Sequence, residues 1–123
     1  ETAHKNILMN LALNLKAVIS LRLVIAKDGR RMPATEVLIN TPMIRDLIRR
    51  GEVHDVKDAM DKSLEDCMHT FDQSLYKHYK EGKVELEEAL RNADSRDGLA
   101  LKVRLSEGAD AEHDPYGDLY SQH

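Results

Sequence analysis

Cysteine and aromatic side chains are scarce in this sequence. Of its 123 residues one is a cysteine, Cys67, none is a tryptophan, and the aromatic residues make up 4%. A single cysteine excludes an internal disulfide framework and any zinc site built on a pair of cysteines, and it agrees with a reducing compartment. With so few rings the core must consist of Leu, Ile, Val, Met and Ala, so we expect mainly helical packing.

The chain also lacks a long apolar run and a glycine-rich loop. Its most apolar stretch, residues 7–25, is interrupted by polar and charged side chains, so we expect no membrane insertion. Its six glycines are scattered and no G-x-x-x-x-G-K-S/T motif occurs, so the usual nucleotide-binding loop is missing. No basic leader precedes an apolar region and the sequence begins at Glu1, so we expect it to be cut from a longer protein.

The remaining composition is that of one globular domain. Hydrophobic residues make up 41% and charged residues 33%, and 123 residues suit a single folding unit. The net charge of −4 is uneven, because residues 1–50 are basic and residues 106–123 contain acidic residues with no Lys or Arg. The basic excess is modest and carries no interleaved aromatic residues, so we expect no nucleic-acid binding.

The first forty residues predict a long helix followed by a β-hairpin. Residues 3–21 are apolar around most of a helical circumference. Asp28 and Gly29 form a turn signal between two runs rich in β-branched residues, which predicts strands near 22–27 and 31–39.

Two residues of the second strand need separate interpretation. Pro33 has no N–H to donate to a ladder, so it should lie at an edge or a bulge. Glu36 is a carboxylate among apolar residues and can pair with Arg30 or Arg31, although a solvent-facing position on a half-buried strand is the favoured interpretation.

The segment TPMIRDLIRRG, residues 41–51, has the signals of a complete short helix over 42–50. Thr41 can cap it, Pro42 fits its first turn, and Gly51 can take the left-handed conformation after its end. One face of this helix is apolar and another is charged. The residues that we single out as an interaction site are Ile44, Arg45, Asp46, Leu47, Ile48, Arg49 and Arg50.

Further helices are predicted after Gly51. Thr70 and Gln73 form a capping box in front of a helix that Gly82 can stop, and residues 85–93 predict another short helix. The expected apolar stripes are Val53, Val56, Met60 and Leu64 on the helix before the capping box, and Phe71, Leu75 and Tyr79 on the helix after it.

The end of the chain is ambiguous. Apolar residues alternate strictly over 99–105, which favours a strand, although Asp94 or Ser95 as a cap would also permit a helix. Residues 106–123 are acidic, rich in turn residues and short of core residues, which predicts a disordered acidic tail.

Several residues of catalytic type have simpler interpretations. His54 with Asp55 and Asp58 could bind a metal only weakly, so we predict no metal site. Cys67 near His69 suggests a thiol nucleophile, but Asp66 opposes thiolate formation, so we interpret Cys67 as a buried or half-buried structural residue. The carboxylates Glu85, Glu87 and Glu88 lie at a helix start, where negative charge is favourable, and need no catalytic role. We therefore assign no catalytic and no cofactor-binding residue.

Several separated motifs, in order along residues 1–105, resemble one known family. They are LNLKAVISLRLV, GRRMPATEVLINTP, MIRDLIRRGEVHDVKDAM, MHTFDQSLYKHYKEGKV and EEALRNADS. Together they resemble the C-terminal portion of the type IV pilus retraction ATPases, which are the PilT/PilU twitching-motility family within the secretion ATPases. The sequences of these motifs resemble the PilU branch more closely. The helix at 42–50 is similar to the family's A-I-R-N-L-I-R-E box, from which Met43, Asp46 and Arg50 depart.

The resemblance implies a place for each part of the chain. Residues 1–40 would end a RecA-like ATPase core, with the hairpin as edge strands of its sheet, and 41–105 would form a C-terminal helical subdomain. The fold class is then α+β and mostly α, a hairpin followed by a bundle of short helices. The arginine box would serve subunit packing or transmission of motion, because Arg45 and Arg49 can offer planar multi-donor heads to a neighbouring element.

The family also implies partners and a location. Its members form ring hexamers in the cytoplasm beside the bacterial inner membrane and use ATP and magnesium to drive pilus retraction. Expected partners are other subunits of the same ring, a paralogous retraction ATPase and the inner-membrane pilus platform. The chain alone lacks the Walker motifs and should not hydrolyse ATP. The alternatives left open are a free-standing helical adaptor, a small thiol enzyme using Cys67 and His69, and part of a type II secretion or pilus assembly ATPase.

Overall fold

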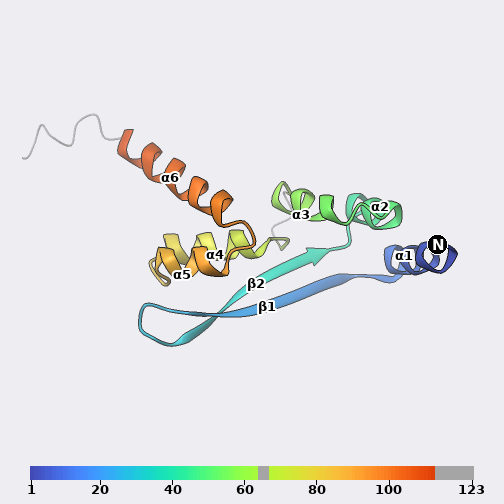
Figure 1. The fold of residues 1–123 in the computed structure, drawn as a ribbon, viewed down its shortest axis with the longest axis horizontal. Helices are drawn as coiled ribbons and strands as arrows, with labels where there is room; N and C mark the ends of the chain where they lie inside the picture. The colour runs from blue at the N-terminus through green and yellow to red at the C-terminus, as the bar shows by residue number, and fades with distance from the viewer. Residues whose placement is uncertain (64–66, 113–123) are drawn as a thin grey trace, which may run out of the picture.

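The computed structural model describes residues 1–63 and 67–112, with side chains described as far as Asp110. One helix, α1 (Thr2–Asn14), precedes a hairpin of β1 (Ala17–Ile25) and β2 (Arg31–Ile39). Five helices follow, namely α2 (Pro42–Arg50), α3 (His54–Asp61), α4 (Phe71–Lys80), α5 (Leu86–Asn92) and α6 (Arg96–Glu112). The expected class, a hairpin with mostly helical surroundings, is confirmed (Figure 1). Within the described ranges, no helix combines the length and apolarity needed to cross a bilayer.

The boundary between α1 and β1 differs from the prediction. Residues 17–21 of the helix expected at 3–21 are strand, so the strand expected at 22–27 begins five residues earlier, at Ala17, and ends at Ile25. Asn40, just after β2, accounts for this, because its Nδ2 donates to the carbonyl oxygens of Ala12 at 3.0 Å and Leu15 at 2.7 Å. These bonds give donor partners to carbonyls at the end of α1 that would otherwise lack them. The residues that follow can then leave the helix and pair with β2 along its whole length.

The hairpin pairs without a break in register. Ala17 faces Ile39 at one end and Ile25 faces Arg31 at the other, and β2 has the predicted bounds. Gly29 has a φ of 83° in the connecting turn, a conformation that favours glycine.

The outer edge of β2 is covered by polar groups of the following segment. The contacts are Pro33 O with His78 Nε2 (2.9 Å), Thr35 N with Ser74 Oγ (3.2 Å), Val37 N with His69 O (2.9 Å) and Ile39 N with Met68 Sδ (3.5 Å). Pro33 thus lies on this strand's outer edge, as expected.

The two faces of the hairpin have different surroundings. Val24 and Ala34 are fully buried on the face that packs against α4 and α5. The opposite face of β1 carries large apolar side chains that are between 51% and 74% exposed, namely Ile19, Leu21, Leu23 and Ile25. A broad apolar surface therefore lies uncovered on the hairpin.

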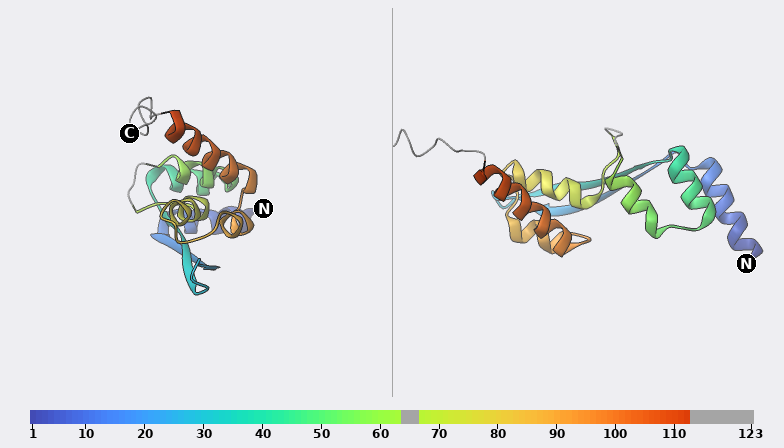
Figure 2. Two further views of the ribbon diagram at one scale, coloured as in Figure 1. Left: turned by 90° about the vertical axis from the view of Figure 1, so that its left-hand side faces the viewer. Right: turned by 90° about the horizontal axis from the view of Figure 1, so that it is seen from above.

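Two hydrophobic clusters divide the helices into two lobes along the hairpin. The α1–α3 lobe is centred on Ala12, Ile44, Leu47, Ile48, Val56, Met60 and Met68. The α4–α6 lobe is centred on Val24, Ala34, Phe71, Leu75, Val84, Ala89, Leu90 and Leu99. Figures 1 and 2 show the lobes at opposite ends of the hairpin, which connects them lengthwise.

The end of the described chain is helical, which corrects two predictions. Residues 99–105 lie inside α6 rather than in a strand, with Leu99 and Val103 buried one helical turn apart. The alternation of apolar and polar residues led to the wrong prediction of a strand because Leu101 and Leu105 are exposed, so the apolar residues of this segment do not share one buried face. The tail expected from 106 is also wrong as far as 112, where α6 ends, and its remainder, 113–123, lies outside the described residues.

The capping and stop signals in the sequence predict the helix ends correctly, and, among its described residues, the apolar stripe predicted for α3 is correct except at Val53. The Thr70–Gln73 capping box is present, Gly82 follows the end of α4, and α5 lies inside the range expected for it. Val56 and Met60 are buried as predicted, but Val53 is 59% exposed because it precedes α3, and Leu64 lies outside the described residues.

Candidate functional site

Helix α2 has the bounds and the buried face that its sequence predicts. The Thr41 side chain accepts a hydrogen bond from Ile44 N at 3.3 Å, and Gly51 ends the helix with a φ of 74°. Ile44, Leu47 and Ile48 are buried against α1 and α3. The helix is therefore fixed to its own lobe, and its other side is left for charged groups.

The charged side of α2 carries a local ion-pair network. Asp46 pairs with Arg49 at 2.6 Å and with Arg50 at 3.1 Å, and Arg50 also reaches Glu52 at 3.4 Å. The hydrogen bond from Arg49 lowers the pKa of Asp46, with a smaller contribution from Arg50. Arg45 is exposed, and its guanidinium has no ion-pair or hydrogen-bond partner among the described residues.

This surface can act as a donor surface for a neighbouring element. The three arginines exceed Asp46 and Glu52 by one positive charge, and guanidinium groups offer several donors in a fixed plane. Arg45 and Arg49 are not held together as a pair, because Arg49 turns to Asp46. The apolar residues of the predicted site are thus buried, and its charged residues are open to solvent.

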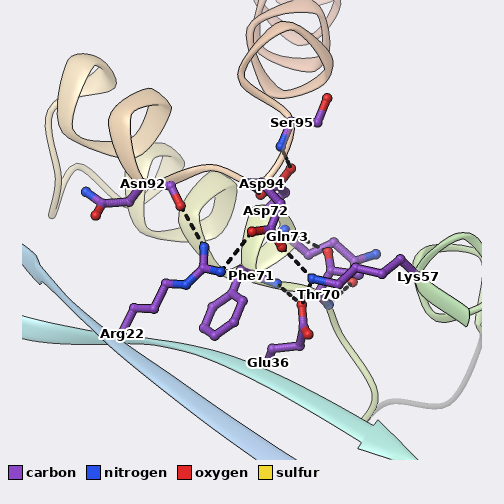
Figure 3. A network of polar contacts seen from close by, with 10 residues as sticks. All are labelled: Arg22, Glu36, Lys57, Thr70, Phe71, Asp72, Gln73, Asn92, Asp94 and Ser95. Carbon is purple, nitrogen blue, oxygen red and sulfur yellow. Dashed lines mark hydrogen bonds and ion pairs between the residues drawn. The ribbon is translucent and has the colours of Figure 1, made fainter. Parts of the chain in front are cut away.

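A second polar site, which the sequence did not reveal, lies between the lobes. We call Arg22, Glu36, Lys57 and Asp94 the polar junction (Figure 3). The Lys57 ammonium on α3 contacts Glu36 Oε2 at 3.0 Å and Asp94 Oδ2 at 2.5 Å, and Arg22 binds the other oxygen of Asp94 at 2.8 Å. Four segments distant in sequence meet through these contacts.

Glu36 has a different role from the one expected. Its side chain is 14% exposed and pairs with Lys57 instead of Arg30 or Arg31, which corrects both interpretations. Its Oε2 also accepts from Phe71 N at 3.1 Å, at the start of α4. A carboxylate is favourable there because the first N–H groups of a helix have no partner inside it.

Phe71 lies beneath the cations of the junction. The Arg22 guanidinium is 4.0 Å from the ring centroid and the Lys57 ammonium is 5.8 Å from it, so both are within reach of its negative face. Arg22 also donates to Asn92 O at 3.0 Å. The junction therefore combines ion pairs, a helix cap and ring contacts in one place.

The junction shifts two pKa values. Partial burial raises the pKa of Asp94, but hydrogen bonds from Lys57 and Arg22 outweigh it and leave the pKa below its ordinary value. Partial burial likewise lowers the pKa of Lys57, and the bonds to Asp94 and Glu36 outweigh it and leave that pKa raised. Both groups are thus held in their charged forms.

A cavity of about 330 Å³ adjoins the junction. Its charged lining residues are Lys57, Lys102, Asp58, Asp61, Asp72 and Asp94. Asp72 is engaged in accepting from Asp94 N at 2.8 Å and Ser95 N at 3.0 Å. Since carboxylates outnumber lysines, this cavity disfavours a triphosphate.

The thiol and metal candidates are not assembled into sites. Cys67 is exposed, which corrects the buried interpretation, and the His69 ring instead contacts Thr35 Oγ1 at 2.8 Å. His54 Nε2 lies 3.6 Å from Asp55 Oδ1 on an exposed surface. Across residues 1–63 and 67–112, no group of three His, Cys, Asp or Glu side chains is arranged to hold a metal ion.

Two proteins with similar sequences are a type IV pilus ATPase and a twitching motility protein. No family model matches the chain. The type IV pilus ATPase PilU of Pseudomonas aeruginosa is 47% identical over 111 residues, which is 89% of this chain and 29% of that protein. A twitching motility protein of Neisseria gonorrhoeae is 32% identical over 89 residues, 72% of this chain and 24% of that protein.

Solved structures give the same relationship. The pilus retraction motor PilT with bound ADP matches with a TM-score of 0.68 and 32% identity, over 78% of this chain and 26% of that one. The ATPase DotB of Yersinia pseudotuberculosis, at 21% identity, shares the fold over 74% of this chain and 24% of that one with a TM-score of 0.59. The chain is therefore homologous to a part of the PilT/PilU family of type IV pilus retraction ATPases, and it spans between 24% and 29% of these relatives.

Proposed function

We propose that this chain is the C-terminal part of a type IV pilus retraction ATPase and that it serves subunit packing and force transmission. The observation that carries the proposal is α2, whose apolar face is buried in its own lobe while its arginines face outward. The 47% identity with PilU, against 32% with PilT, supports a PilU-like motor. The arginine surface would contact carboxylates or carbonyls of a neighbouring subunit.

The hairpin would join the chain to the ATPase core. Its exposed apolar face is the kind of surface that a larger sheet and its covering helices would bury. Residues 1–40 would then complete a RecA-like core, and the helices from 41 onward would form the C-terminal subdomain. ATP and magnesium would bind to parts of the motor outside this chain.

The surroundings follow from the same proposal. The motor would assemble as a ring of identical subunits on the cytoplasmic side of the inner membrane. Its further partners would be a paralogous retraction ATPase and the pilus platform in that membrane. The arginine surface is the candidate contact for one of these partners.

The test is made in the complete motor, with Arg45→Ala and Arg49→Ala combined. We expect pilus retraction to be impaired while ATP binding stays near the wild-type level, because both side chains lie on an outward surface of α2. Twitching motility and nucleotide affinity are the measurements.

A matched control removes two exposed cations elsewhere, Lys62→Ala with Arg104→Ala. This control should retain retraction. Loss of ATP binding in the Arg45 and Arg49 double variant, or equal motility defects in both double variants, would contradict the proposed function.

A further inference from the structure

Each lobe has its own packing, and the helices of one lobe pack little against those of the other. The extensive helix contacts are α1 with α2 and α2 with α3 in one lobe, and α4, α5 and α6 with one another in the second. Among the described elements, no helix pair from different lobes packs as extensively as these. The lobes therefore have separate hydrophobic clusters, and both lobes pack against the same hairpin (Figure 2).

The side chain that joins the lobes most directly is Lys57. It belongs to α3 of the first lobe, and its ammonium binds Asp94 between α5 and α6 of the second. Its other partner, Glu36, is on the hairpin and holds the first amide of α4. A second link is a single hydrogen bond of 3.1 Å from Gln73 Nε2 to Asp61 O.

We infer that the chain has a hinge between the α1–α3 lobe and the α4–α6 lobe, and that Lys57 is a positioning residue that latches the hinge in the closed arrangement. The hairpin keeps the lobes connected while the latch sets their relative angle. This inference concerns the chain's own mechanics and does not depend on the proposed function.

The latch has the properties of a reversible contact. The side chains of Lys57 and Asp94 are 48% and 33% exposed, so water and salt compete for the pair. The clusters inside each lobe are buried and apolar, and salt does not weaken them in this way. Breaking the latch should therefore alter the angle between lobes and leave each lobe folded.

The test measures the distance between the lobes by double electron–electron resonance on the 123-residue chain. Spin labels are placed at Met43→Cys on α2 and Leu101→Cys on α6, two positions that are 65% and 52% exposed. The exposed native cysteine is removed by Cys67→Ser. The latch variant is Lys57→Met, and its matched control is Lys62→Met, at an exposed lysine that directly follows the same helix.

We expect one narrow distance distribution in the parent chain and in Lys62→Met, and a broadened or longer distribution in Lys57→Met. Lys57→Arg should restore the narrow distribution, and 1 M salt should broaden that of the parent chain but not that of Lys57→Met, because the Debye length is then only about 3 Å.

Equal distributions in Lys57→Met and Lys62→Met would overturn the inference. Loss of the helical circular dichroism signal in Lys57→Met would also overturn it, because the lysine would then be required for folding within a lobe rather than for holding two folded lobes together.

Discussion

The chain contains two networks of charged side chains, and they differ in what they connect. On α2 the network joins Asp46, Arg49 and Arg50 within one helix, at separations of three and four residues. In the polar junction, Lys57 reaches partners 21 and 37 residues away, and Arg22 reaches one 72 residues away. The first network lies on the surface of a single helix and connects it to no other described element. The second network connects several elements and fixes their relative positions.

Their surroundings also differ. The side chains of Arg49 and Asp46 are 56% and 43% exposed, a setting in which ion pairs contribute little to stability. Glu36 is 14% exposed and caps a helix as well as pairing with a cation. The comparison predicts that charge removal in the junction lowers the free energy of unfolding without unfolding either lobe, while the same change on α2 leaves the free energy of unfolding nearly unchanged.

The largest effect should follow from Glu36→Ala. The change leaves the Phe71 amide without its acceptor and takes one partner from Lys57, so we expect a loss of about 1–3 kcal/mol in the free energy of unfolding. Urea denaturation measures it. Glu36→Gln, which keeps an oxygen that can accept from Phe71, should recover part of the loss, and equal stability of the Ala variant and the parent chain would show the junction to be as weak as the α2 network.

An acid titration should give a smaller effect, through Asp94. Because its folded pKa lies below the ordinary value of 3.8, its contribution is present above pH 3.8 and is lost as the pH falls through the folded pKa. Unfolding free energies measured between pH 5 and about pH 3 should fall more steeply in the parent chain than in Asp94→Asn. Identical slopes would mean that Lys57 and Arg22 do not favour the ionised form of this carboxylate.

The smallest effect is expected for Asp46→Asn. Its pKa is lowered by the bond from Arg49, but the pair is exposed and lies within one helix that is already capped at both ends. The thermal unfolding midpoint should match that of the parent chain within error, while the net positive charge of the α2 surface increases by one. A clear fall in the midpoint would remove the distinction between the two networks.

The features that the sequence predicted correctly depend on neighbouring residues. Thr41 and Gly51 delimit α2, and Thr70 with Gln73 caps α4, because each signal acts within one helical turn. The apolar half of the candidate site was predictable for the same reason, since Ile44 and its neighbours follow the helical period.

The features that were missed depend on residues distant in sequence. The end of α1 is fixed by the side-chain amide of Asn40, which follows the second strand of the hairpin and is distant from α1 in sequence. No signal near residue 14 could therefore predict where α1 ends. The burial of Glu36 depends on Lys57 and Phe71, and the helix at 99–105 depends on packing that leaves Leu101 exposed. Alternation in the sequence cannot separate such a helix from a strand.

The covered edge of β2 limits how this small sheet can grow. Pro33 has no amide hydrogen, and the outward amides of Thr35, Val37 and Ile39 are already occupied by groups of the following segment. Among the described residues, an added strand would therefore find no free backbone donor along positions 33–39 of β2. Lateral addition of a strand is therefore hindered along this part of β2, and the other edge of the sheet is β1, which also carries the exposed apolar side chains and whose Ile25 amide already donates to Glu88.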